Sequence, residues 1–133
     1  MKMLGIFEKT FNLVKFALKL RSYRHTLLSS NIANVDTPGY KRKDISFEKL
    51  IQSYLSQEGF LKTTKPQHLK GLNKNLNELI KPYEDETIGT PNNVNLEEEL
   101  VKLSENQILY EATLQALSKE LEKLKEAITE GGK

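Results

Sequence analysis

The chain has 133 residues, of which 38% are hydrophobic and 29% charged, and it contains no cysteine. This length suits one structural unit rather than two. The modest apolar fraction favours a thin, helix-rich molecule over a compact globule. Without cysteine, the chain cannot form a disulfide framework, a thiolate metal site or a cysteine nucleophile.

The sequence offers no apolar segment for crossing or entering a membrane. No run reaches the ~18 apolar residues that a transmembrane helix needs. Near the N-terminus, Lys2 and Glu8 interrupt the apolar residues before a signal core could form. We therefore expect neither a transmembrane helix nor a cleaved secretory signal.

The net charge of +2 conceals two oppositely charged ends. Residues 1–32 hold six basic side chains and one acidic side chain, a net charge of +5. Residues 95–130 hold nine acidic and four basic side chains, a net charge of −5. The two end segments are therefore electrostatic complements.

The pattern divides the chain into three parts. We expect an N-terminal amphipathic helix in residues 1–32, a turn motif with a short helix and an irregular middle region in residues 33–94, and a C-terminal coiled-coil helix with a tail in residues 95–133. The predicted fold class is mainly α, with the two long helices forming a coiled-coil-like pair, a loop-rich middle and little β structure.

The N-terminal helix carries two neighbouring apolar stripes. The first consists of Ile6, Leu13, Phe16, Leu20, Tyr23 and Leu27, and the second of Phe7, Phe11, Val14, Leu18 and Leu28. Together they are wider than one partner helix covers, which predicts contact with more than one neighbour. The alternative is an ordinary core-facing helix of a small bundle.

A sharp corner is expected directly after this helix. In Thr37-Pro38-Gly39-Tyr40, proline presets φ at the second position and glycine accepts a positive φ at the third, which predicts a type II turn. Asn31 and Asn34 lie where the helix must stop, and their side chains can satisfy the freed backbone groups. Lys41-Arg42-Lys43 then forms either a solvated loop or a contact with an acidic helix of the same assembly.

The middle region contains one short helical pattern. Its apolar residues are Phe47, Leu50, Ile51, Tyr54 and Leu55, and Ser46 precedes them as a candidate cap. From Gly59 to Asn93 the sequence is polar and interrupted by proline and glycine. We expect loop there, with at most a short strand or hairpin.

Residues 95–130 give the strongest pattern. Apolar residues alternate four and three apart in a seam that only Gln107 interrupts: Leu96, Leu100, Leu103, Gln107, Tyr110, Leu114, Leu117, Leu121, Leu124 and Ile128. Asn95 is a suitable N-cap, and Glu97-Glu98-Glu99 favours the positive end of a helix dipole. At 1.5 Å per residue the helix is about 50 Å long. Such a seam needs a long partner, as in a coiled coil.

The chemistry of an enzyme is missing. His25 and His68 are the only histidines, and neither has ligands at metal-binding spacing. The sequence has no glycine-rich phosphate loop and no nucleophile motif. We therefore expect no catalytic activity, no cofactor, no metal and no nucleic-acid partner.

The segment Ser30 to Arg42, SNIANVDTPGYKR, resembles the N-terminal signature of bacterial flagellar rod and hook proteins. Further matches resemble the short proximal-rod members of that family. These are Phe7-Glu8-Lys9, Thr64 to Leu69, Val94 to Glu99, Glu105-Asn106-Gln107 and Tyr110. The resemblance covers nearly the whole chain. One departure is Gly89 to Asn93, which stands where relatives often have an Asp-Gly-Asn turn.

The resemblance implies a structural subunit of the flagellar basal-body rod that self-assembles through its terminal helices. It implies export by the flagellar type III apparatus through an uncleaved signal, and a place on the periplasmic side of the inner membrane. The implied partners are other rod subunits, copies of the chain itself, the adaptor between rod and membrane ring, and the export apparatus. Contact with the membrane would be indirect, through the membrane-embedded ring.

Two groups of residues follow from this interpretation. The assembly motif consists of Asn31, Asn34, Asp36, Thr37, Pro38, Gly39 and Tyr40. The helix interface consists of Phe7, Phe11, Val14 and Leu18 together with the ten residues of the C-terminal seam. The alternatives are another rod subunit of the same family, a generic coiled-coil adaptor, or a basic amphipathic helix on a membrane. The last two explain the stripes but not the corner.

Overall fold

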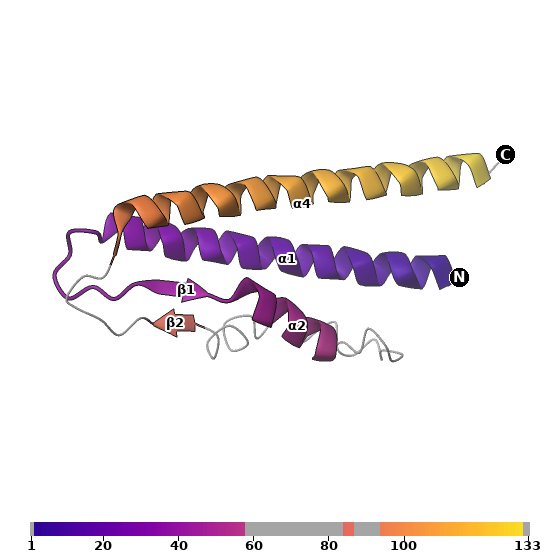
Figure 1. Cartoon of the computed structure of the whole chain (residues 1–133). Coiled ribbons are helices and arrows are strands. Elements are labelled where there is room, and N and C mark those ends of the chain that lie inside the picture. The colour runs from indigo at the N-terminus through magenta and orange to yellow at the C-terminus, as the bar shows by residue number, and fades with distance from the viewer. Residues whose placement is uncertain (1, 58–83, 87–93, 132–133) are drawn as a thin grey trace.

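The computed structural model describes residues 2–57, 84–86 and 94–131. Along the chain, the elements are α1 (Lys2–Ala33), β1 (Lys43–Ile45), α2 (Phe47–Gln57), β2 (Glu84–Glu86) and α4 (Leu96–Gly131). Figure 1 shows α1 between α4 on one side and the layer of β1, β2 and α2 on the other. The prediction of a mainly α fold with little β structure is confirmed.

The two terminal helices form a long antiparallel pair. The start of α1 and the end of α4 lie at the same end of the molecule, and the two helices run side by side (Figure 1). The expected N-cap is present, because Asn95 Oδ1 accepts the backbone N–H groups of Glu97 at 3.1 Å and Glu98 at 3.4 Å. The side-by-side packing of α1 and α4 confirms the predicted pairing of the terminal helices.

A small apolar core lies between α1 and α2. Phe16 and Leu20 of α1 pack with Ile45, Leu50 and Tyr54, and the rings of Phe16 and Tyr54 stack with centroids 4.3 Å apart. The first stripe of the N-terminal helix thus packs against the short helix, as its periodicity allows.

One member of that stripe differs from the others. Ile6, near the free end of α1, is 65% exposed. The small core closes before reaching it, because α2 is much shorter than α1.

The two strands make a short antiparallel ladder in which Lys43 faces Glu86 and Ile45 faces Glu84. Within the segment expected to be loop, Gly59 to Asn93, β2 is the described element. The rest of that segment, including His68, lies outside the described residues. None of the described helices has an apolar stretch long enough to cross a bilayer.

Candidate assembly site

The corner after α1 is a hydrogen-bonded turn. Gly39 has a φ of 74°, and the N–H of Tyr40 donates to the carbonyl of Thr37 at 3.3 Å. These features are those of the expected type II turn. Asn34 Nδ2 donates to the carbonyl of Ser30 at 2.8 Å, and its Oδ1 accepts the Thr37 hydroxyl at 3.0 Å. Asn34 thus satisfies a carbonyl at the helix end, as expected.

Asn31 has a different role from the one expected. Its side chain is fully buried and bonds the backbone of β1 rather than the end of its own helix. Its Nδ2 donates to the carbonyl of Lys43 at 2.7 Å, and its Oδ1 accepts the N–H of Lys43 at 3.1 Å. Oδ1 also accepts the Tyr40 hydroxyl at 3.0 Å, and Nδ2 also donates to Glu99 at 3.2 Å. All four hydrogen-bonding positions of the amide are occupied.

Four charged side chains extend the hydrogen-bonded network around this amide. Arg42 donates from Nε to Glu99 Oε1 and from a terminal nitrogen to Asp44 at 2.9 Å. Arg24 holds the same Asp44 carboxylate with two bonds, of 2.9 and 3.1 Å. We call Arg24, Asn31, Tyr40, Arg42, Asp44 and Glu99 the polar joint, because they connect α1, β1 and α4.

Burial and hydrogen bonds within the polar joint shift the pKa values of Asp44 and Arg42. Burial by itself raises the pKa of Asp44, but the hydrogen bonds from Arg24 and Arg42 outweigh it and bring this pKa below its ordinary value. Burial likewise lowers the pKa of Arg42, but the bonds to Glu99 and Asp44 reverse the shift and raise that pKa. These two shifts favour the charged forms of Asp44 and Arg42 at neutral pH.

A second polar contact joins α4 to α1 farther along the pair. Asn106 Nδ2 donates to the backbone carbonyl of Arg21 at 2.8 Å, and its Oδ1 accepts from the Arg21 guanidinium at 3.4 Å. The same guanidinium lies over the ring of Phe47, 3.7 Å from its centroid. Arg21 thereby connects α4 to α2.

The helix α4 has two distinct faces. The inner seam, which faces α1, consists of buried and half-buried residues: Glu99, Leu103, Asn106, Tyr110, Thr113, Leu117 and Leu124. The outer stripe consists of exposed residues seven positions apart: Leu100, Gln107, Leu114, Leu121 and Ile128. Leu96 is exposed as well, and so are Val101 and Ile108 beside the outer stripe.

The predicted seam is therefore divided between the two faces. Leu103, Tyr110, Leu117 and Leu124 belong to the inner seam, whereas the other six predicted residues are exposed. The polar residue inside the seam is Asn106 and not Gln107, which is exposed and donates to Glu111 at 3.0 Å. Glu99, expected with Glu97 and Glu98 to favour the positive end of the helix dipole, is only 1% exposed, whereas Glu97 and Glu98 are exposed.

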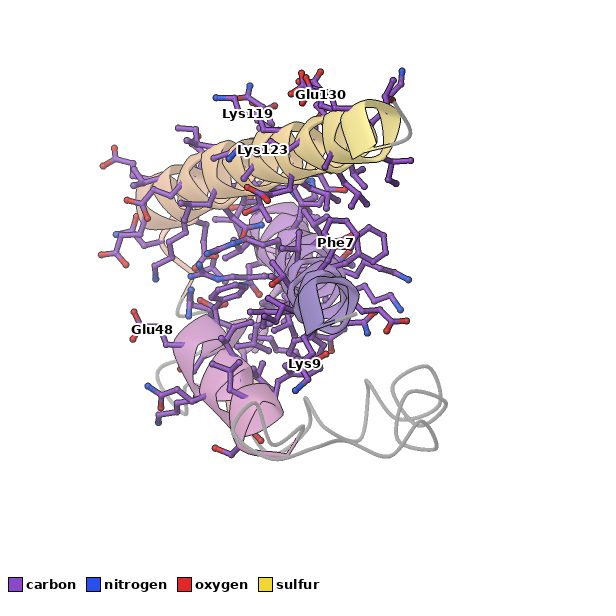
Figure 2. The ribbon with its side chains drawn as sticks, turned by 90° about the vertical axis from the view of Figure 1, so that its right-hand side faces the viewer. Phe7, Lys9, Glu48, Lys119, Lys123 and Glu130 are labelled. Carbon is purple, nitrogen blue, oxygen red and sulfur yellow. The ribbon has the colours of Figure 1, made fainter. Side chains whose placement is uncertain are left out.

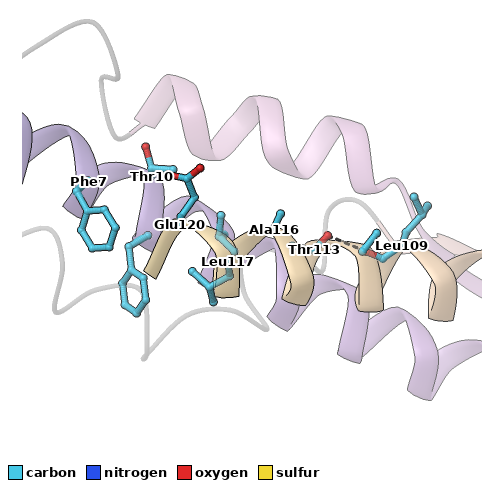
Figure 3. A pocket seen from close by; sticks show the side chains of 10 residues that line it. Phe7, Thr10, Leu109, Thr113, Ala116, Leu117 and Glu120 are labelled. Carbon is cyan, nitrogen blue, oxygen red and sulfur yellow. Dashed lines mark hydrogen bonds between the residues drawn. The ribbon is translucent and has the colours of Figure 1, made fainter. Parts of the chain in front are cut away.

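An apolar groove lies between the N-terminal part of α1 and the middle of α4. It has a volume of about 460 Å³ and is lined by Phe7, Phe11 and Val14 of α1 and by Leu109, Ala112, Ala116 and Leu117 of α4, with Thr10, Thr113 and Glu120 completing it. Figure 3 shows Phe7 and Leu117 entering this space from the two helices. Figure 2 shows Phe7 at the side of the pair, whereas Lys119 and Glu130 point away from α1.

Sequence reasoning missed Arg24, Asp44, Glu99 and Asn106 as parts of this site. Glu99, Asn106 and Thr113 repeat every seven residues, but Leu100, Gln107 and Leu114 do so as well, so this spacing alone does not distinguish the inner from the outer face. Of the three basic residues after the turn, Arg42 contacts the acidic helix of its own chain, and the two lysines are exposed.

The remaining predicted residues have simpler surroundings. Asp36 and Pro38 lie exposed on the surface of the corner, and Leu18 is half-buried on α1. Within the described part of the chain, no group of three or more histidines, aspartates or glutamates is placed to hold a metal ion. The polar joint, with its hydrogen bonds satisfied, orients elements of the backbone.

Paired terminal helices, a hydrogen-bonded polar corner and exposed apolar surface are features typical of a structural subunit. Residues 17–41, which include the second half of α1 and the corner, match the family described as flagella basal body rod protein.

Curated relatives match over almost the full length. The chain is 34% identical to the flagellar basal body rod protein FlgB of Aeromonas hydrophila, over 92% of this chain and 94% of that protein. It is 30% identical to FlgB of Bacillus subtilis, over 98% and 100% of the two chains. It is 31% identical to FlgB of Escherichia coli, over 86% and 89%. The chain belongs to the FlgB family of flagellar basal-body rod proteins.

Family membership gives the function at this level. The chain is a structural component of the flagellar basal-body rod, where it assembles with other rod components, and it is not an enzyme.

Proposed function

We propose that the chain is a subunit of the proximal rod and that its outer stripe and apolar groove are its contacts with neighbouring subunits. The observation that carries this proposal is the exposure of the outer stripe. Leu100, Leu114 and Leu121 are each more than 40% exposed although they repeat at heptad spacing. A heptad seam that its own chain leaves open suits a helix supplied by another subunit.

The groove supports a contact on a second face. Its α4 wall contains the small side chains of Ala112 and Ala116, which allow a neighbouring helix to approach closely. The groove and the outer stripe are different surfaces of one molecule. A contact that joined one to the other would be heterologous, and such contacts build open, repeating assemblies rather than closed pairs. Other rod subunits and copies of this chain are the proposed occupants.

Charge would steer these contacts. The basic residues of α1 and the acidic residues of α4 give the two helices opposite net charges, so α1 of one subunit attracts α4 of the next. Exposed ion pairs contribute only ~0–1 kcal/mol each and are screened by salt. The charges therefore set approach and register, and the apolar stripes hold the subunits together.

The route and the position are part of the same proposal. The chain would be exported by the flagellar type III apparatus with an uncleaved N-terminal signal. It would then join the base of the rod on the periplasmic side of the inner membrane, next to the adaptor that links rod and membrane ring. Membership of the rod family supports this route. Equal electrophoretic mobility of the chain in cell extracts and in purified basal bodies is the expected result, and a shorter chain in the basal bodies would contradict it.

The assembly contact is tested by Leu114→Asp. A charge in the outer stripe would have to be desolvated when the stripe packs against a neighbour. We expect the variant to be exported at the normal level but to be absent from purified basal bodies, as measured by immunoblotting. Gln115→Asp is the matched control, because it adds the same charge at the next exposed position and should be incorporated. Normal incorporation of Leu114→Asp would overturn the proposed contact.

A further inference from the structure

The inner seam contains two buried polar side chains whose roles the rod function does not explain. Glu99 and Asn106 are each 1% exposed, lie seven residues apart and occupy equivalent heptad positions. The apolar residues of the seam, Leu103, Tyr110 and Leu117, also repeat every seven residues. Apolar packing alone would therefore accept α4 after a slip of one heptad, about 10 Å along α1.

The surroundings of the two polar residues are not interchangeable. Glu99 receives hydrogen bonds from the Asn31 amide and the Arg42 guanidinium, so its position requires an acceptor and favours an anion. Asn106 donates to the carbonyl of Arg21 at 2.8 Å and accepts from the Arg21 guanidinium at 3.4 Å, so its position requires a donor and an acceptor together, which an amide supplies. A carboxylate there would face a carbonyl oxygen, and an amide beside Arg42 would leave that half-buried cation without its carboxylate partner on α4.

We propose that Glu99 and Asn106 fix the register of α4 on α1 and exclude the one-heptad slip. Glu99 holds the start of α4 at the corner, because its two donors, Asn31 and Arg42, belong to the polar joint. Asn106 selects the point at which Arg21 also contacts Phe47, so the register is coordinated with the docking of α2. By fixing the register, the two residues also fix the position of each outer-stripe residue along the length of α1. This inference does not depend on the proposed rod contacts, since it concerns two helices of one chain.

Exchanging the two residues provides a sharp test. In Glu99→Asn/Asn106→Glu, the native register opposes Arg42 with an amide and the Arg21 carbonyl with a carboxylate. A one-heptad slip would place the new glutamate beside Asn31 and Arg42 again, and Thr113, whose hydroxyl can donate, beside the Arg21 carbonyl. The exchange should therefore favour the slipped pairing.

Cysteine cross-linking of the purified full chain reports the register, because the chain has no cysteine of its own. Val14 and Thr113 both line the groove, so a chain that carries Val14→Cys together with Thr113→Cys reports the native register. Val14→Cys with Glu120→Cys reports the slip, since residue 120 would then take the place of residue 113. With a short bismaleimide, we expect the exchange to change the ratio of the two products by on the order of tenfold toward the slip.

A second variant covers the case in which the exchanged chain fails to fold. Glu99→Leu/Asn106→Leu removes both polar side chains that distinguish the two registers, while Arg42 keeps its bond to Asp44, so the variant should be less stable than the native chain but should favour neither register. We expect this variant to remain helical by circular dichroism and to give both cross-linked products. Gln107→Glu is the control, because it places a carboxylate on the exposed face and should keep the product ratio of the otherwise native chain. An unchanged product ratio in both folded double variants would overturn the proposal.

Discussion

At the scale of single residues, the corner depends on Asn31 and Gly39 for different reasons. The Asn31 amide bonds the backbone N–H and carbonyl of Lys43, the hydroxyl of Tyr40 and the carboxylate of Glu99. These four bonds fix the position of β1 relative to the end of α1. Gly39 supplies a backbone conformation that other residues adopt only at a cost. Both act on the direction of the chain after the helix.

Gly39→Val should destabilise the corner by about 1–3 kcal/mol. A Cβ at this position would meet no other atom within 4 Å, so the cost comes from the positive φ and not from crowding. Gly39→Asn is the matched control, because asparagine enters this conformation more readily. Urea unfolding of the purified chain measures the difference. Equal stability of the two variants would show that the turn does not constrain the corner.

The lowered pKa of Asp44 gives the joint a pH dependence with a defined sign. A carboxyl group whose pKa is lower in the folded state stabilises the fold above its unfolded pKa, about 3.9, and loses this contribution as the pH falls through the folded value. Asp44→Asn should therefore be less stable than the native chain at pH 7, and the gap should close below about pH 4. Denaturation followed by circular dichroism across this range checks it. A gap that stays constant down to pH 3 would contradict the assignment.

At the scale of elements, the two faces of α4 separate stability from assembly. Leu117 lies in the inner seam and lines the groove, whereas Leu114 is 41% exposed on the outer stripe. Leu117→Asp should lower the free energy of unfolding by about 1–3 kcal/mol, because it places a polar group between the helices. Leu114→Asp should change it by no more than about 0.5 kcal/mol. Thermal unfolding of both variants tests this order, and equal losses would mean that the two faces are not distinct.

Local features of the elements could be predicted from the sequence. The type II turn, the Asn95 cap and the heptad period of α4 depend on residues that are close together in the chain. The rotational position of the seam could not be predicted in the same way. Leucines occupy the outer stripe as well, and ranking residues by hydrophobicity excludes Glu99 and Asn106 from the interior.

Those two residues are buried because of partners far away in the sequence. Glu99 meets Arg42 across 57 residues, and Asn106 meets Arg21 across 85. The ion pair between Arg24 and Asp44 also joins two different elements, and no periodic pattern in the sequence predicts it. A buried polar side chain is satisfied only by specific donors and acceptors, and their meeting depends on the fold.

At the scale of the whole molecule, the elongated helix pair covers only part of its own apolar surface. Beyond Leu117, α4 is exposed on nearly every residue, whereas Phe16 and Leu20 in α1 are buried. In the isolated chain, amide hydrogens of residues 121–131 should therefore exchange faster than those of residues 16–28. Unwinding the end of α4 breaks few tertiary contacts and so costs little free energy. Hydrogen exchange with mass spectrometry measures this gradient. Uniform protection along α4 in dilute solution would contradict it.

In the proposed rod assembly, the outer stripe of α4 is buried against a neighbouring subunit. Site-specific photo-cross-linking in assembled basal bodies detects this burial, with the photoreactive residue at Leu114 and a matched one at Leu103 in the inner seam. We predict an intermolecular adduct with another rod subunit from position 114 and none from position 103. A chain that is incorporated normally but gives no intermolecular adduct from position 114 would show that the outer stripe is not buried against a neighbouring subunit.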